Sequence, residues 1–278
     1  MTSAGAPSAG APSAVDREQL RFARYRQSRH EALAAEFGWL TLTSLQWLGA
    51  EPTTVELLPG LWSANDSASA GGIATLTATA ADNLVFAETG EPVDGSVTAR
   101  LANEESLNWV RFGNIVVELA VRADRYAIRT RDLDSPVYTG FNGVPTFDFN
   151  PDLVVTGHFT AYDAERQVPI ATSHPQVQST ATAVGEVSFE LGGASHRLVA
   201  EPGTLGGLTL NFHDLTNGTS TYDWRKVTTA KPRPDGSVII DFNRAINYPS
   251  AFTPYGTCPR PIRGNQIDAL IEAGEKMP

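Results

Sequence analysis

The 278-residue sequence has very little cysteine and lysine, and it has no long hydrophobic run. A single cysteine cannot form a disulfide within the chain, which fits a reducing compartment, so the cytoplasm is the predicted location. Only three of the 21 basic residues are lysine, and the net charge of −10 argues against non-specific nucleic-acid binding, which requires cations. No hydrophobic run approaches the length of a membrane span, so no membrane partner is predicted.

Familiar catalytic and cofactor motifs are also absent. The sequence contains no G-x-G-x-x-G, no phosphate-binding loop, no H-E-x-x-H, no G-x-S-x-G and no C-x-x-C. Its five histidines show no metal-ligand spacing. We therefore predict no metal and no cofactor, in a chain whose 41% hydrophobic content is ordinary for a globular protein.

The N-terminus divides into a tail and a helix. Residues 1–14 repeat Ser-Ala-Gly-Ala-Pro without a basic residue or a hydrophobic stretch, which predicts a disordered tail rather than a signal peptide. A helical arm is predicted over about 16–37, with Asp16 as its cap and Gly38 ending it. Its apolar residues fall near one stripe: Phe22, Tyr25, Leu33 and Phe37.

Four arginines crowd the first half of this helix: Arg21, Arg24, Arg26 and Arg29. A solvated face is the interpretation that we favour, and an anion-binding face is the alternative.

After Gly38 the hydrophobic period changes to two, which is typical of strands. Apart from a possible helical turn near 266–273, little further helix is expected. The sequence predicts a mainly β fold, a barrel or sandwich of many short antiparallel strands with one N-terminal helix. We expect a single domain over 15–278, closed by a proline-rich segment at about 244–278. The expected strands are near 40–47, 53–58, 73–79, 84–87, 97–102, 115–122, 126–131, 153–162, 177–184, 187–191, 194–200, 205–213, 221–227 and 237–243.

Two alternating runs in the middle of the chain predict a hairpin. A tight turn at Asp124-Arg125 would pair Ile128 with Val121 and Arg131 with Glu118, which keeps apolar and polar residues on opposite faces.

Several separated motifs agree with one known family. The runs Asp241-Phe242-Asn243-Arg244-Ala245-x-Asn247-x-Pro249 and Tyr255-x-Thr257-Cys258-Pro259-x-Pro261 resemble the DUF1684 family of uncharacterised bacterial and archaeal proteins. Further matches in order are Gly38-Trp39-Leu40, Arg129-x-Arg131-Asp132, and Phe212-x-Asp214 followed by Arg225. The resemblance implies a soluble prokaryotic protein and supplies no activity. Members often carry a second cysteine where Ser250 stands, so this chain lacks a two-thiol pair.

The first candidate site group is Arg129, Arg131 and Asp132. The two arginines share one strand face, where parallel guanidinium groups can bind a carboxylate or phosphate. The structural alternative pairs Arg131 with Glu118 on a solvated face and leaves Asp132 to cap a turn.

The second group is Asp214 with Arg225. Asp214 extends the apolar side of its strand, where a carboxylate requires a partner, and Arg225 is a plausible one. An Asx-turn through Asp214 and Thr216 is the alternative for the loop.

The third group is Asp241, Asn243, Arg244 and Asn247. An aspartate beside an amide and a guanidinium can act as a general base. Equally, such side chains satisfy backbone groups in an irregular loop.

Cys258 lies near Arg260 and Arg263, which could lower its pKa, although a lone cysteine is more often a small buried hydrophobic residue. Glu275 is expected to pair with one of the arginines.

Two hypotheses follow. In the first, the protein binds a small anionic molecule, or is a cofactor-independent enzyme, in an Arg/Asp/Asn pocket where Asp241 or Asp214 acts on a proton. In the alternative, a non-catalytic binding or scaffold module uses the same residues as an internal ion-pair network. Convergence on one concave pocket would favour the first, and separate closed pairs the second.

Overall fold

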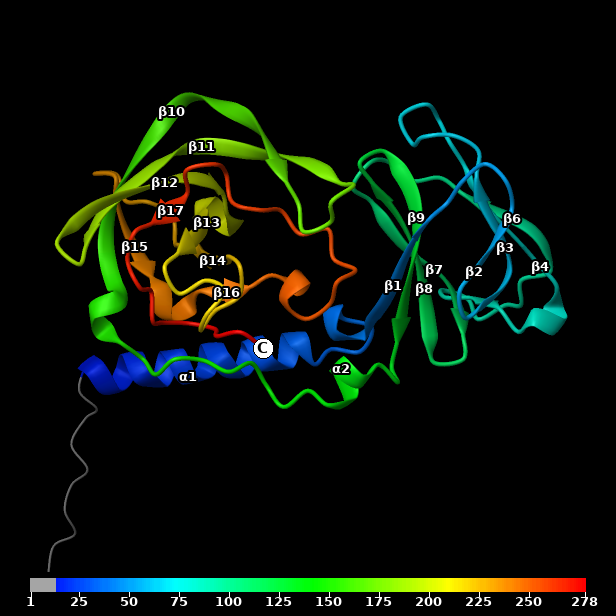
Figure 1. The fold of residues 1–278 in the computed structure, drawn as a ribbon, viewed down its shortest axis with the longest axis horizontal. Helices are drawn as coiled ribbons and strands as arrows, with labels where there is room; N and C mark the ends of the chain where they lie inside the picture. The colour runs from blue at the N-terminus through cyan, green and yellow to red at the C-terminus, as the bar shows by residue number, and fades with distance from the viewer. Residues whose placement is uncertain (1–13) are drawn as a thin grey trace, which may run out of the picture.

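The computed structural model describes residues 14–278, which form two groups of strands side by side, with one long helix beneath the C-terminal group (Figure 1). The mainly β fold with an N-terminal helix is confirmed. The predicted disordered tail lies outside the described residues except for Ala14. Within the described part of the chain, no helix is long and apolar enough to cross a membrane.

The N-terminal lobe is a sandwich of two antiparallel sheets. One sheet has the order β1-β9-β8-β7-β5, and the other has the order β2-β3-β4-β6. Alternate residues point to opposite faces of a strand, so Leu119, Tyr126 and Ile128 meet Trp62 and Leu76 in a core between the sheets. The strands are β1 Leu42–Trp47, β2 Thr53–Val55, β3 Leu58–Ala64, β4 Ala74–Ala78, β5 Val85–Phe86, β6 Gly95–Ala99, β7 Ser106–Phe112, β8 Ile115–Arg122 and β9 Arg125–Asp132.

The C-terminal lobe is one eight-stranded sheet that curls around its own core as a half-barrel (Figure 1). Its path is β15-β10-β11-β12-β13-β14-β16, and β17 joins β13 in parallel. Phe212, Phe242 and Ile240 lie in this core. The strands are β10 Val154–Ala171, β11 Gln178–Leu191, β12 Ala194–Pro202, β13 Leu208–Asp214, β14 Arg225–Thr228, β15 Ser237–Asp241, β16 Ile246–Asn247 and β17 Gln266–Ile267.

Helix α1 spans Ala14–Leu33 and lies against the C-terminal lobe (Figure 1). It begins before Asp16 and ends before Gly38, so neither predicted end is correct. Phe22 and Leu33 are buried, as the stripe predicts. A short second helix, α2, spans Pro136–Thr139. Short 3₁₀ helices occur at Trp39–Thr41, Ala80–Asp82, Pro151–Leu153, Thr204–Gly206, Phe242–Arg244 and Pro249–Ala251.

The predicted register of the β8–β9 hairpin is wrong by two residues. Ile128 pairs with Leu119, and Glu118 stands opposite Arg129. The turn residues are Ala123 and Asp124, whose φ angles are 47° and 64°. Two successive positive φ angles are those of a tight hairpin turn, and the chain adopts them here without glycine. A shift of two preserves the faces, so the polar side chains still share one side.

Other boundaries also differ from the prediction. The two runs at 177–184 and 187–191 are one strand, β11, and β7 has no predicted counterpart. The segment predicted as a helical turn near 266–273 contains β17 instead. Gly192 and Gly193, both with positive φ angles, form the turn between β11 and β12. A single domain over 15–278 stays a prediction.

Candidate functional site

The outer face of the five-stranded sheet is polar and lies against the C-terminal lobe. Across this contact, Arg129 Nη2 donates to Thr257 Oγ1 at 3.0 Å, and Thr253 Oγ1 donates to the Leu42 carbonyl at 3.1 Å. Arg129 is 0% exposed and Glu118 is 3% exposed. The solvated face considered for this hairpin is therefore wrong, because a second lobe covers it.

Glu118 bridges the two arginines of the first candidate group. Its Oε1 lies 3.3 Å from Arg129 Nη1, and its Oε2 accepts from Arg131 Nε at 2.8 Å. Burial alone would raise the pKa of the Glu118 carboxyl, but the guanidinium groups of Arg131 and Arg129 outweigh it and lower the pKa. Arg131 also donates to the Gly38 carbonyl at 2.7 Å, so its guanidinium has structural partners.

An interlobe cavity of about 340 Å³ opens beside Arg129. The N-terminal lobe, the C-terminal lobe and α1 all contribute to its wall. The lining residues are Arg29, Trp39, Glu104, Arg122, Arg129, Lys226, Ile246, Asn247, Tyr248, Pro249, Thr257, Cys258 and Pro259.

The charge of this lining is strongly one-sided. Four cationic side chains come from four elements: Arg29 from α1, Arg122 from β8, Arg129 from β9 and Lys226 from β14. The single acidic lining residue is Glu104, whose side chain is 56% exposed and lies 3.8 Å from Arg122.

Lys226 is the cation of this set without a carboxylate partner. Within residues 14–278, no carboxylate oxygen lies within 4.0 Å of its amine. The Nζ atom lies 4.7 Å from the centre of the Tyr248 ring. Burial lowers the pKa of the Lys226 amine, and the positive charge of Arg29 lowers it further.

Two buried polar atoms of the lining residues have no hydrogen-bond partner in the described chain: Arg129 Nε and Asn247 Oδ1. Both residues are almost fully buried, at 0% and 1% exposed. Buried polar groups are usually satisfied, so this wall of the cavity is incomplete as a purely structural network.

Cys258 also lines the cavity but is 6% exposed and packs with Trp224 and Tyr248. Burial raises the pKa of its thiol. At neutral pH the thiol is therefore protonated, which favours the buried-hydrophobic interpretation over a nucleophile.

Asp214 and Arg225 form a closed pair in the C-terminal lobe. Arg225 Nη2 donates to Asp214 Oδ2 at 2.8 Å, and both side chains are 0% exposed. The Ile271 and Ala273 carbonyls accept from the same guanidinium. Thr216 N donates to Asp214 Oδ1 at 2.8 Å, so the predicted Asx-turn is present as well.

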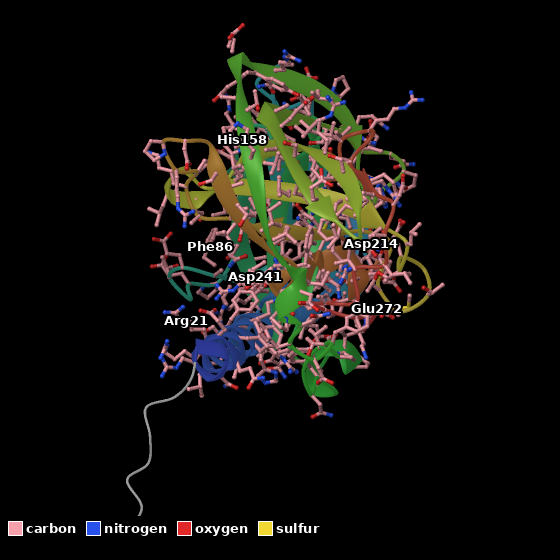
Figure 2. The ribbon with its side chains drawn as sticks, turned by 90° about the vertical axis from the view of Figure 1, so that its left-hand side faces the viewer. Arg21, Phe86, His158, Asp214, Asp241 and Glu272 are labelled. Atoms are coloured by element: carbon pink, nitrogen blue, oxygen red, sulfur yellow. The ribbon has the colours of Figure 1, made fainter. Side chains whose placement is uncertain are left out.

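The third group also serves the local backbone. Asp241 Oδ1 accepts from Asn243 N at 3.1 Å, and Asp241 Oδ2 lies 3.0 Å from Arg244 Nε. The Asn243 amide is paired in both directions with the backbone of Asn150. Figure 2 shows Asp214 and Asp241 at well-separated positions in the C-terminal lobe.

The predicted site residues therefore do not share one hollow. Arg129, Asn247 and Cys258 line the interlobe cavity. Arg131 does not line this cavity and is linked to Arg129 through the shared Glu118 carboxylate. Asp132 caps a turn, where its side chain accepts a hydrogen bond from Asp134 N at 2.9 Å. The others lie in the C-terminal lobe: Asp214, Arg225, Asp241, Asn243 and Arg244.

Sequence reasoning missed three cations of the cavity: Arg29, Arg122 and Lys226. Arg29 was assigned to a solvated face, which holds for the exposed Arg21 but not here. Arg29 Nε donates to Glu275 Oε1 at 2.8 Å, and its Nη2 donates to the Asn247 carbonyl at 3.0 Å. A signal existed, because Arg29 follows Tyr25 and precedes Leu33 by four residues, on the buried stripe. The predicted pairing of Glu275 with an arginine is confirmed.

Comparison with known proteins gives a family and no activity. No curated protein matches the chain. A solved structure, the solution NMR structure of an uncharacterized protein from Haloarcula marismortui, is 27% identical with a TM-score of 0.42, covering 50% of this chain and 78% of that one. Residues 139–276 match the model described as "Protein of unknown function (DUF1684)", which confirms the resemblance. This family match covers residues 139–276, and it does not extend to the motifs at Gly38-Trp39-Leu40 and Arg129-x-Arg131-Asp132.

Proposed function

We propose that the protein binds a small anionic molecule in the interlobe cavity. The observation that carries this proposal is the convergence of Arg29, Arg122, Arg129 and Lys226 on one cavity with a single, largely exposed acid. Like charges repel when they are partly buried, so such a set is stabilised when an anion lies between them.

The chemistry of the lining suits a carboxylate or a phosphate. Guanidinium groups present paired donors to such oxygens, and partial burial strengthens the interaction relative to water. The cavity volume lies within the range of small-molecule sites. Asn247 adds an acceptor with no partner in the described chain, and Tyr248 adds an aromatic wall.

A larger cavity of about 510 Å³ lies between α1 and residues 142–146. Its charged lining consists of Arg26, Arg29 and Glu275, and the last two are paired with each other. The interlobe cavity is the better candidate because four cations from four elements line it, and one of them, Lys226, has no carboxylate oxygen within 4.0 Å in the described part of the chain.

The alternative function, a scaffold with an internal ion-pair network, describes the Asp214–Arg225 pair well. The two proposed catalytic aspartates have their carboxylates committed to nearby donors. We therefore propose ligand binding for Arg129 and Asn247, a buried apolar wall for Cys258, and a structural role for Asp214, Arg225, Asp241, Asn243 and Arg244.

The test is Lys226→Met, which removes the amine and keeps the length of an apolar side chain. Titration calorimetry of the wild type with inorganic phosphate, pyrophosphate and citrate should detect binding of at least one anion. In the variant, affinity should fall tenfold or more, which is about 1.4 kcal/mol. The free energy of unfolding should not decrease, because no ion pair is broken.

Lys231→Met is the matched control, since Lys231 is exposed and lies outside the lining. It should leave anion affinity unchanged. The proposal fails if the wild type binds none of the three anions, or if both variants bind as tightly as the wild type.

A further inference from the structure

We infer that the Lys226 amine forms a Schiff base with the carbonyl group of an anionic ligand. This inference rests on the proposed function and narrows its ligand class to small anions that carry an aldehyde or a ketone, such as oxo acids or phosphorylated aldehydes.

The position of Lys226 separates it from the other cations of the cavity. Its strand, β14, pairs with β13 at Asn211 and with β16 at Ile246, inside the C-terminal sheet. Arg122 and Arg129 come from the opposing sheet of the N-terminal lobe. An anionic group bound by those arginines can therefore leave a second group of the same molecule facing the amine.

The surroundings of the amine increase the fraction of its neutral, nucleophilic form. A lysine reacts with a carbonyl only when neutral, and a carboxylate in contact with it would hold it protonated. No carboxylate oxygen lies within 4.0 Å of Lys226 in the described chain. Burial and the Arg29 charge lower the pKa of the amine, and the opposing charges of Cys258 and Glu201 do not reverse this shift. The neighbouring Tyr248 hydroxyl is committed to Asn211 Oδ1 at 2.7 Å.

The bond changes balance without an oxidant or a reductant. The nitrogen lone pair attacks the carbonyl carbon, the C–O π pair moves to oxygen, and proton transfer from nitrogen gives a neutral carbinolamine. Loss of that hydroxyl as water leaves a carbon–nitrogen double bond. When this imine is protonated, its positive charge replaces that of the original ammonium beside the bound anion.

The scarcity of lysine makes the inference directly testable, because the chain offers two internal controls. Lys276 is half-buried and its Nζ lies 4.6 Å from the centre of the Phe147 ring, a setting that resembles that of Lys226. Lys231 is exposed. Neither of these residues lines the interlobe cavity.

The experiment traps imines with cyanoborohydride and maps them by peptide mass spectrometry. Pyridoxal 5′-phosphate serves as a probe with both an aldehyde and an anion, pyridoxal as an aldehyde without the phosphate, and pyridoxine 5′-phosphate as the anion without the aldehyde. A carboxylate series uses 4-carboxybenzaldehyde, benzaldehyde and 4-methylbenzoate in the same roles.

At least one anionic aldehyde should label Lys226 tenfold or more above Lys276, and its neutral counterpart should lose most of this preference. Lys226→Arg should abolish labelling at position 226, while thermal unfolding shows that the variant folds. The matching anion without an aldehyde should protect Lys226 in the wild type.

Three results would overturn the inference. Equal labelling of Lys226 and Lys276 by both anionic aldehydes, with anion binding intact by calorimetry, would remove the Schiff base and leave the proposed function standing. Equal preference for neutral and anionic aldehydes at Lys226 would remove the role of the arginines. Equal labelling together with no anion binding would overturn both proposals.

Discussion

Arg225 and Arg129 are both fully buried arginines on strands, yet their surroundings differ. Arg225 is enclosed by Asp214 and by the carbonyls of Ile271 and Ala273 in a closed network. Arg129 shares one carboxylate, Glu118, with Arg131, and it borders a cavity whose other charged groups are mostly cations. Burial alone therefore does not distinguish a structural arginine from one that borders a binding site. The charge around each arginine does, since both guanidinium groups also have a buried Nε without a hydrogen-bond partner in the described chain.

Removing a carboxylate should lower the free energy of unfolding more in the closed network around Arg225 than in the cluster around Arg129. Asp214→Asn leaves the Arg225 guanidinium buried without a counter-charge, so the free energy of unfolding should fall by about 3–5 kcal/mol in urea denaturation. Asp241→Asn is the matched control, because its partner Arg244 is 38% exposed and the amide can still cap the backbone. It should cost about 1 kcal/mol or less. Equal losses in the two variants would remove the distinction between closed and exposed pairs.

The open cluster, which consists of Glu118, Arg129 and Arg131, should lose less stability when its carboxylate is removed. A bound anion should restore part of that stability. Glu118→Gln removes the carboxylate between Arg129 and Arg131, with an expected cost of about 1.5–3 kcal/mol for charged hydrogen bonds. An anion that binds the wild type should raise the melting temperature of Glu118→Gln more than that of the wild type. The same anion should give Asp214→Asn no such extra gain. A gain of equal size in both variants would contradict a site at Arg129.

A hydrogen bond between α1 and the C-terminal lobe should contribute a smaller, pH-dependent amount to the free energy of unfolding. Tyr25 Oη donates to the Arg244 carbonyl at 3.0 Å, and burial, with the charge of Glu275, raises the pKa of Tyr25 to about 12. Because the folded-state pKa lies above the ordinary value of 10.0, the contribution of Tyr25 is fully present below pH 10. It is lost as the pH rises through about 12.

Tyr25→Phe should therefore cost about 0.5–1.5 kcal/mol at pH 7, the typical net value of one hydrogen bond. The stability gap between wild type and variant should narrow as the pH rises from 10 to 12, as followed by denaturant unfolding at each pH. A gap that widens over this interval would contradict the assigned direction of the pKa shift.

The smallest effect is expected at Cys258. Burial raises the pKa of its thiol, so we expect Cys258→Ala to change anion affinity by less than about twofold, at a stability cost of about 1 kcal/mol. Calorimetric titration and urea denaturation measure the two quantities. A loss of affinity like that expected for Lys226→Met would give the thiol a direct role in the site.

Sequence patterns identified the closed Asp214–Arg225 network better than the cluster around Arg129 and Arg131. The parity of Leu210, Phe212 and Asp214 places a carboxylate on an apolar face, where it requires a partner. Arg129 and Arg131 share a predicted face, but nothing local shows what covers that face. Thr257, which accepts a hydrogen bond from Arg129 across the lobe contact, is 128 residues away in sequence. A polar strand face that is buried by another lobe has the same alternation as one that faces water.

Lys226 is a second residue of the cavity that the sequence pattern could not identify. The residues around it in the sequence form no pattern that marks it, since the property that matters is that no carboxylate of the described chain comes within 4.0 Å of its amine. Arg29 could have been recognised from its helical spacing, because it lies on the stripe with Tyr25 and Leu33. Periodicity was thus informative where a residue's own element fixes its environment, and insufficient where two lobes meet.

The ion pair between Arg29 and Glu275 joins residues 246 positions apart, and so encloses nearly all of the described chain in one loop. Closing a loop of that length loses conformational entropy before any contact compensates it, which slows folding. While the polypeptide is being synthesised, Phe22 of α1 can pack against Phe149 once that residue has been made. The Arg29 guanidinium gains its Glu275 partner only after nearly all of the described chain has been made, so this ion pair fastens α1 last.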